Sequence, residues 1–260
     1  MVITTDDSAK REFVNRLHQQ TGEQVKLVLV YRNPRARWWQ RFQRRLKTVG
    51  WPKLWHEFWF ALKLRISRRT QQALNYFHRA TVSPELSGQF IPPTKSIVTV
   101  NTNEIHKLLR ELSPDLIVVW GSPILQPHII NSAKKVINLH MGYCPHYRGS
   151  ISNQWAVLDN RWECIGATIH YVEQEVDSGQ ILSIIPADHS KPPEELFLDL
   201  NNRAREQYLD IATRLYNGED LPGVPQDISL GRKTFIKDWT HERRYRVAKA
   251  ILDWEQHYSN

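Results

Sequence analysis

Short apolar runs alternate with amphipathic stretches along much of the chain. MVITTDD opens with a strand pattern, SAKREFVNRLHQQ has a helical period, and VKLVLVY is typical of a buried strand. From residue 96 onward further strands are predicted at SIVTV, DLIVVWG, KVINLH, ATIHYV and QILSIIPAD, with helical stretches between them and a long helix over 192–217. This order predicts an α/β fold in which crossover helices connect the strands of a parallel sheet. No glycine-rich phosphate loop follows the first strand, so the dinucleotide-binding fingerprint is absent.

Residues 34–80 interrupt the alternation. Aromatic and aliphatic residues recur there at helical spacings and predict two or three helices, broken near Gly50-Trp51-Pro52: Trp38, Trp39, Phe42, Leu46, Trp51, Leu54, Trp55, Phe58, Trp59 and Leu62. One interpretation is an inserted hairpin whose aromatic face packs on the domain and whose basic face is solvated. A basic, Trp-rich helix can also lie on an anionic membrane surface. Nucleic acid or another anion is a further alternative, although no RNA-binding motif supports it.

The positive charge of the chain is concentrated in this same region. The formal net charge is +8, but residues 32–79 contain thirteen Lys/Arg and a single acid, Glu57. The remainder of the chain is therefore net acidic. The two cysteines, Cys144 and Cys164, form no CxxC pair and no zinc-like spacing with histidine, so we expect neither a disulfide framework nor a metal site. No uninterrupted apolar stretch of about 18 residues is present, which favours a cytoplasmic protein, peripheral to the membrane if 34–80 binds lipid.

Polar side chains that suggest chemistry stand at the end of the VINLH strand. Because strand side chains alternate between faces, Asn138 and His140 project from the same face. A turn-rich loop follows, and after the ATIHYV strand an acidic loop ends at Asp177 and Gly179. Asp177 is the candidate third member of a reaction centre.

The stretch NLHMGYCPHYRG followed by GATIHYVEQEVDSGQIL resembles the signature of the formyltransferase family that uses 10-formyltetrahydrofolate. Its members formylate glycinamide ribonucleotide, methionyl-tRNA or amino sugars on nucleotides. The family pattern is an Asn-x-His strand end, a Pro-x-x-x-Gly loop and an Asp-x-Gly loop, matched here by Asn138 and His140, Pro145 and Gly149, and Asp177 and Gly179. The resemblance spans roughly 113–185 and implies a doubly wound, mostly parallel, Rossmann-like domain. Asn138, His140 and Asp177 occupy its catalytic positions.

These residue types suit formyl transfer. A neutral amine attacks the formyl carbon, and negative charge develops on the formyl oxygen. Asn138 can donate an N–H to that oxygen, and His140 can donate as well and, if cationic, neutralise charge. Asp177 can orient the imidazole or a water and collect the proton that the amine loses. His170 and His146 are expected to be structural or at the edge of the substrate site, and Cys144 has no assigned base and is not expected to be a nucleophile.

The resemblance also implies a largely backbone-lined pterin pocket. Its residues are expected in two loops: Ser122, Pro123, Ile124 and Leu125 after Gly121, and Glu173, Gln174, Glu175 and Val176 before Asp177. Such loops lie at the carboxyl ends of strands. On the acceptor side we expect Gly142, Tyr143 and Arg148. The usual Ser-Leu-Leu-Pro stretch of the family is Gly142-Tyr143-Cys144-Pro145 here, which indicates a differently shaped acceptor mouth.

The sequence therefore predicts a catalytic domain over 1–217, with the helical insertion at 34–80, and a short C-terminal extension over 218–260. The predicted activity is N-formyl transfer from 10-formyltetrahydrofolate, without a metal, to a small amine such as an amino sugar on a nucleotide. The segment RGSISNQWAVLDN is closest to sugar-nucleotide members. The stretch after 218 is shorter than the barrel of tRNA-directed members, and no N-terminal regulatory domain of the hydrolytic relatives is expected. The alternatives are a 10-formyltetrahydrofolate hydrolase, or an idle module that binds a membrane or partner through 34–80.

Overall fold

A seven-stranded sheet forms the centre of the molecule. The computed structural model describes residues 1–32 and 38–258, and of residues 38–49 the helical backbone alone. The strands lie in the order β3 (Thr94–Ile97), β2 (Val28–Tyr31), β1 (Val2–Thr4), β4 (Leu116–Trp120), β5 (Lys135–His140), β7 (Gly166–Tyr171) and β8 (Ile181–Pro186). Pairing is parallel from β3 to β5, whereas β7 is antiparallel to both β5 and β8. The predicted doubly wound, mostly parallel sheet is confirmed.

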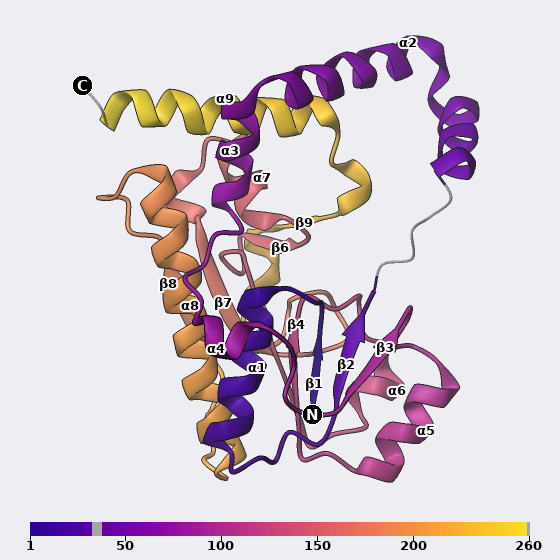
Figure 1. The fold of residues 1–260 in the computed structure, drawn as a ribbon, viewed down its shortest axis with the longest axis vertical. Coiled ribbons are helices and arrows are strands. Elements are labelled where there is room, and N and C mark those ends of the chain that lie inside the picture. Colours follow the sequence, from indigo (N-terminus) through magenta and orange to yellow (C-terminus); the bar gives the residue numbers. More distant parts are fainter. Residues whose placement is uncertain (33–37, 259–260) are drawn as a thin grey trace.

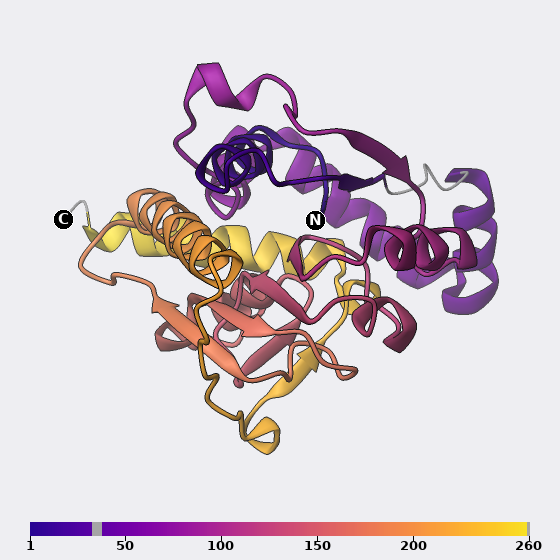
Figure 2. The same cartoon turned by 90° about the horizontal axis from the view of Figure 1, so that it is seen from below.

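Helices cover both faces of this sheet (Figure 1 and Figure 2): α1 (Ser8–Gln20) and α8 (Pro193–Tyr216) on one, α5 (Asn103–Leu112) and α6 (Pro127–Ile130) on the other. The alternation of strand side chains divides the core accordingly. Ile137 and Leu139 of β5 join the cluster with α1 and α8, whereas Val136 joins the cluster with α5 and α6. Asn138 and His140 continue the row that begins at Val136, as the alternation predicts.

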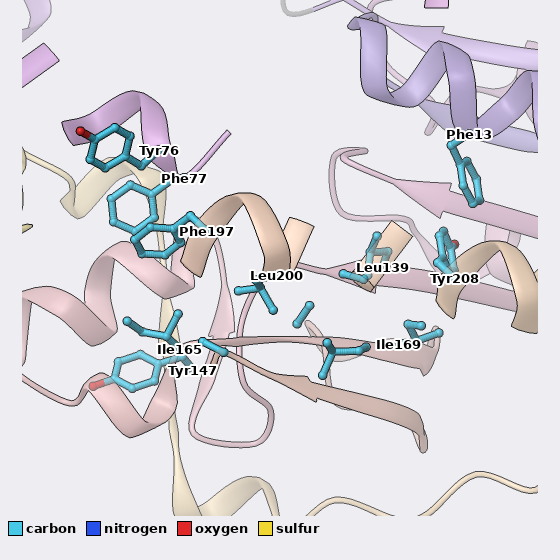
Figure 3. Close-up of a cluster of buried hydrophobic side chains, with 14 of the residues drawn as sticks. Phe13, Tyr76, Phe77, Leu139, Tyr147, Ile165, Ile169, Phe197, Leu200 and Tyr208 are labelled. Carbon is cyan, nitrogen blue, oxygen red and sulfur yellow. The ribbon is translucent and has the colours of Figure 1, made fainter. Parts of the chain in front are cut away.

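Tyr208 fixes α8 to the two strands that lead to the candidate site. Its ring stacks on Phe13 of α1 with centroids 5.0 Å apart (Figure 3). Its hydroxyl accepts a hydrogen bond from the Val119 N–H at 3.0 Å and lies 2.8 and 3.0 Å from the carbonyl oxygens of Val119 and Ile137. A buried hydroxyl that lacked these partners would be destabilising. The contact therefore holds β4 and β5 in register beneath the same helix.

The segment predicted as two or three helices contains α2 (Trp38–Ile66), interrupted by a non-helical Gly50 at φ 73°, and α3 (Arg68–Tyr76). Residues 34–37 and the side chains of Trp38, Trp39, Phe42 and Leu46 lie outside the described part. α2 and α3 pack on α9 (His241–Tyr258). Just after α3, the Phe77 ring contacts that of Phe197 on α8 with centroids 4.2 Å apart (Figure 3).

One interpretation of this segment places its aromatic face against the domain, and for four aromatic residues of the predicted stripe the structure shows otherwise. The side chains of Trp51, Trp55, Phe58 and Trp59 are more than half exposed. The residues of α2 that do face the body are others, among them the buried Leu64 and the half-buried Phe60, whose ring contacts Tyr245 of α9. Helical periodicity identified an apolar stripe without indicating that the helix has a second apolar face for packing.

The residues after 217 return to the main body. β9 (Arg232–Thr234) pairs in parallel with β6 (Tyr147–Gly149), and α9 contacts α2, α3 and α7 (Ser152–Leu158). The remaining short elements are α4 (Pro84–Ser87) and the 3-10 turns at Trp162–Cys164, Ile228–Leu230 and Ile236–Asp238. β3 begins before the strand predicted at residue 96, because Thr94 pairs with Val28 of β2. In the part of the chain that the structure describes, no helix combines the length and apolar character needed to cross a membrane.

Candidate active site

A cavity of about 840 Å³ lies where the parallel strands end and the sheet changes to antiparallel pairing. The ends of β4, β5 and β7 contribute Trp120, His140 and His170 to its wall. Ligands of open α/β sheets bind outside the carboxyl ends of the strands, as expected for this location. Asn138 and Asp177 line the same cavity, so all three predicted catalytic residues come together there.

Asp177 is the common partner of the polar groups in this cavity. Its Oδ2 accepts a hydrogen bond from the Gly149 N–H at 2.8 Å and lies 3.2 Å from His140 Nδ1. Its Oδ1 lies 3.3 Å from Asn138 Nδ2 and 3.3 Å from His170 Nε2. The carboxylate thus connects two strand ends to the loop that follows β5.

The charge state of Asp177 follows from these contacts. Its side chain is only 14% exposed. Burial alone would raise the pKa of the carboxyl group, but the rings of His140 and His170 and the Gly149 N–H hold that pKa well below its usual range. The Asp177 side chain is therefore ionised at neutral pH.

His140 is held on both sides of its ring. Nε2 lies 3.0 Å from the Tyr147 carbonyl oxygen, and Nδ1 faces Asp177. Both nitrogens can donate at once only when the ring carries two protons. Gly142 is necessary for this arrangement, because a Cβ at that position would lie 2.3 Å from His140 Nε2. A glycine two residues after the histidine thus leaves room for the ring.

His170 is a fourth member of the cluster. It is the direct register partner of Asn138 across the antiparallel β5–β7 pair, and its Nε2 lies 3.2 Å from Asn138 Nδ2. Its Nδ1 lies 2.7 Å from the Tyr171 carbonyl oxygen, which requires a proton on Nδ1. Sequence reasoning left this histidine outside the catalytic set. The pattern predicted a parallel sheet, whereas β7 pairs antiparallel with β5 in a register that places His170 opposite Asn138.

The loop that carries Asp177 is held close to β7. Asp177 has a left-handed backbone conformation with φ 47°. A Cβ on Gly179 would lie 1.9 Å from the Tyr171 carbonyl oxygen, so only glycine fits there. Gln226, from the C-terminal region, donates to the Asp177 carbonyl oxygen at 3.2 Å. The Asp-x-Gly spacing noted in the sequence therefore corresponds to a close approach of two backbones.

All eight residues predicted for the pterin pocket line the cavity: Ser122, Pro123, Ile124, Leu125, Glu173, Gln174, Glu175 and Val176. Their side chains differ in environment. Ile124 is 60% exposed, whereas Leu125 is 6% exposed and belongs to the core cluster beneath α5 and α6. The expected apolar wall is thus formed by Ile124 at the surface, with Leu125 supporting it from inside.

The residues predicted on the acceptor side do not line the cavity. Gly142 lies against His140, and Tyr143 packs against the core. Arg148 is only 3% exposed, because its guanidinium lies 3.3 Å from Glu175 and donates to the Ile228 carbonyl oxygen at 3.0 Å. Further lining residues come from Asp7–Lys10 at the start of α1, Phe77–Ala80 after α3, and Ser150, Ile151, Asn153 and Gln154 at the start of α7, and others from Asn201 of α8 and from Thr234 and Phe235.

A sequence signal existed for one of these segments. Asp7–Lys10 follows the first predicted strand of a parallel sheet, and such loops face ligands. Phe77–Ala80 carries no such signal, because its position depends on how α3 packs on α8 and α9. Lys10 Nζ lies 2.8 Å from Asp7 and 5.6 Å from the centre of the Trp120 ring, and Arg79 forms an ion pair with Glu194.

Cys144 adjoins the site without joining its chemistry. Burial, and then the nearby Asp177 carboxylate, raises the pKa of the Cys144 thiol to about 12. The Cys144 N–H donates to Thr168 Oγ1 at 3.0 Å, which in turn donates to the Gly142 carbonyl oxygen at 2.8 Å. The thiol is thus part of the support of the loop. Among the described residues, no group of three or more His, Cys, Asp or Glu side chains is arranged to hold a metal ion.

Comparison with known proteins identifies formyltransferases, in agreement with the resemblance noted in the sequence. A family model described as "Formyl transferase" matches residues 68–209, more than half of the chain. A methionyl-tRNA formyltransferase of Chlorobium chlorochromatii is 28% identical over 147 residues, which cover 54% of this chain and 45% of the relative. The chain thus spans about half the length of the curated relatives it matches.

Solved structures share the fold. A sugar N-formyltransferase from Shewanella sp. FDAARGOS_354 matches 96% of this chain and 87% of its own with a TM-score of 0.57 at 14% identity. A phosphoribosylglycinamide formyltransferase from Bacillus halodurans matches 85% of this chain and 97% of its own with a TM-score of 0.52 at 17% identity. At these identities the likeness concerns the fold.

Proposed function

Since this chain belongs to the formyl transferase family, we propose that it is an N-formyltransferase that moves a formyl group from 10-formyltetrahydrofolate to a primary amine. The observation that carries the proposal is the cluster of Asn138, His140, His170 and Asp177 in one cavity, with Asp177 in contact with the other three. This cluster contains the hydrogen-bond donors and the base that acyl transfer to nitrogen requires.

Each residue has a distinct part in this reaction. The Asn138 amide and the His140 ring donate N–H groups to the formyl oxygen, where negative charge develops, when that oxygen takes the place of a protein partner such as the Tyr147 carbonyl oxygen. Asp177 is ionised because its pKa is held low. It passes the proton that the attacking nitrogen loses to N10 of the donor as the bond between N10 and the formyl carbon breaks, which releases tetrahydrofolate. Asp177 Oδ2 lies 3.2 Å from His140 Nδ1 and orients that ring while the negative charge on the formyl oxygen grows. His170 positions Asn138 and Asp177 from the neighbouring strand.

The formyl donor fits the two loops over 121–125 and 172–177. Both line the cavity beside the cluster, and the exposed Ile124 and the half-buried Val172 and Val176 offer apolar surface to a flat ring. When bound, 10-formyltetrahydrofolate supplies an activated formyl group attached to nitrogen. The chain's part is to orient that group toward Asn138 and His140.

For the acceptor we propose an amino sugar carried on a nucleotide. The segment that resembles sugar-nucleotide enzymes in sequence, RGSISNQWAVLDN, supplies Ser150, Ile151, Asn153 and Gln154 to the cavity wall. Lys10 and Arg79 line the same cavity and bring positive charge that suits a phosphate-bearing acceptor, although each also pairs with an acid of the chain. Glycinamide ribonucleotide and methionyl-tRNA are the competing acceptors within the family.

The test follows tetrahydrofolate release from 10-formyltetrahydrofolate with purified protein. Release that depends on added nucleotide-linked amino sugar, with a matching gain of one formyl group by mass spectrometry, is the expected result. Release without any amine would indicate a hydrolase. No release with amino sugars, glycinamide ribonucleotide or methionyl-tRNA would indicate an idle module and overturn the proposal.

A further inference from the structure

The C-terminal half of α2 presents an apolar stripe to solvent. Five large side chains recur at i, i+4, i+7, i+8 and i+15, which places them on one side of the helix. They are between 54% and 73% exposed and form what we call the outer face of α2: Trp51, Trp55, Phe58, Trp59 and Ile66. Exposed patches of this kind mark interaction sites.

Core packing does not account for this stripe, because α2 packs on the body through another face. Leu64 is buried, the Phe60 ring contacts Tyr245 with centroids 5.5 Å apart, and Glu57 binds the start of α9. α2 and α9 lie together at one end of the molecule, away from the seven-stranded sheet (Figure 1). The outer face is therefore available for contact with something outside the chain.

The charges around the stripe are almost all positive. Lys53, Arg65, Arg68 and Arg69 are exposed, and Lys63 Nζ lies 5.3 Å from the centre of the Trp59 ring. Glu57, the single acid of residues 32–79, turns inward, where its carboxylate accepts hydrogen bonds from the His241 N–H at 3.0 Å and from Nδ1 at 2.9 Å. The surface that remains combines large aromatic groups with exposed positive charge.

We propose that the outer face of α2 is a docking surface for an anionic lipid bilayer. Trp and Phe side chains partition into the headgroup region, and flanking Lys and Arg attract anionic lipid. A second copy of the chain is a poorer occupant, because face-to-face contact would bring two strongly basic segments together. A nucleic acid would use the charges and stack on the rings, but it would leave the aliphatic Ile66 without a partner.

This proposal is independent of the enzymatic one, because docking can be measured without turnover. Full-length protein is sedimented with vesicles of phosphatidylcholine alone and with vesicles that also contain phosphatidylglycerol. We expect binding to the anionic vesicles only, with blue-shifted tryptophan fluorescence. The outer-face variant, Trp51→Ser with Trp55→Ser and Trp59→Ser, should bind at least roughly tenfold more weakly. Lys53→Glu with Arg65→Glu should weaken binding to anionic vesicles and reduce its sensitivity to salt.

The matched control is Ile91→Ser with Val98→Ser, which removes exposed aliphatic side chains elsewhere on the surface and should bind as the wild type does. Circular dichroism and thermal melting, both unchanged in the outer-face variant, would show that it is folded. Failure of the wild type to bind anionic vesicles, or equal binding by the outer-face variant, overturns the proposal. The wild type could instead self-associate or bind an oligonucleotide without binding vesicles. If the outer-face variant lost that binding, the face would belong to another partner, and the lipid proposal would be overturned as well.

Discussion

Asn138 and His170 lie directly opposite each other in the antiparallel β5–β7 pair, with Nδ2 and Nε2 3.2 Å apart. Directly opposed residues share one face of a sheet, and on that face both side chains contact Asp177. One carboxylate can then hold an amide and two imidazoles that come from different strands.

The first prediction separates the three proposed catalytic residues from His170. Asn138→Ala, His140→Ala and Asp177→Ala should each lower kcat at least roughly a hundredfold, because each removes a donor or the base. His170→Gln should lower kcat only about tenfold, since it disturbs the position of groups that remain. Steady-state kinetics measure kcat for the three alanine variants and for His170→Gln, with His106→Gln on α5 as the control. Near-normal rates in any two of the alanine variants would contradict the assigned roles.

The second prediction concerns the space beside His140. Gly142→Ala should lower kcat strongly, because the new Cβ would meet the ring at Nε2. Gly88→Ala is the matched control: nothing lies within 4 Å of a Cβ there, and its φ of −68° suits alanine. Steady-state kinetics give kcat of both variants, and thermal melting shows whether each is folded. Equal kcat values in the two variants would show that the loop after β5 adapts to the added methyl group.

The third prediction uses the thiols. Because burial raises the pKa of Cys144 to about 12, the native protein should resist iodoacetamide at pH values near 8. Both cysteines, Cys144 and Cys164, should react once urea unfolds the chain, which mass spectrometry can follow. Cys144→Ala should keep turnover within about threefold of the wild type, since the thiol takes no part in the reaction. Rapid inactivation by alkylation of native protein would speak against a purely structural Cys144.

The fourth prediction follows from the low pKa of Asp177. A carboxyl group whose pKa is lower in the folded than in the unfolded state stabilises the fold above its unfolded pKa of about 3.9, and this stabilisation is lost as pH falls below that value. The difference in unfolding free energy between wild type and Asp177→Asn should therefore be constant above about pH 5 and narrow below about pH 4. Urea unfolding followed by fluorescence gives the unfolding free energy of the wild type and of Asp177→Asn at each pH. A difference in unfolding free energy that stays constant below about pH 4 would mean that Asp177 titrates in its ordinary range, and a difference that grows as pH falls would mean that its pKa is raised.

The sequence was sufficient for features that depend on local pattern. The alternation of Ile137, Asn138, Leu139 and His140 predicted which side chains face the core, and the Asp-x-Gly loop identified Asp177. The contribution of His170 required the direction of β7 in the sheet, which periodicity does not contain. The role of Arg148 required knowledge of what covers it, namely Glu175 and the Ile228 carbonyl, the latter 80 residues further along the chain. Local pattern cannot predict such a distant partner.

The parallel pairing of β6 with β9 has a consequence for how the chain is made. The Gly149 N–H that holds Asp177 lies on β6, next to Thr234, whose carbonyl oxygen accepts from the Ser150 N–H at 2.9 Å. A ribosome releases residues 232–234 long after Asn138, His140 and Asp177 have emerged. A nascent chain that ends within α8 holds every residue of the predicted reaction centre without the strand that fixes one wall of it. We therefore expect catalytic competence to appear late in synthesis, after the family-defining stretch has already left the ribosome.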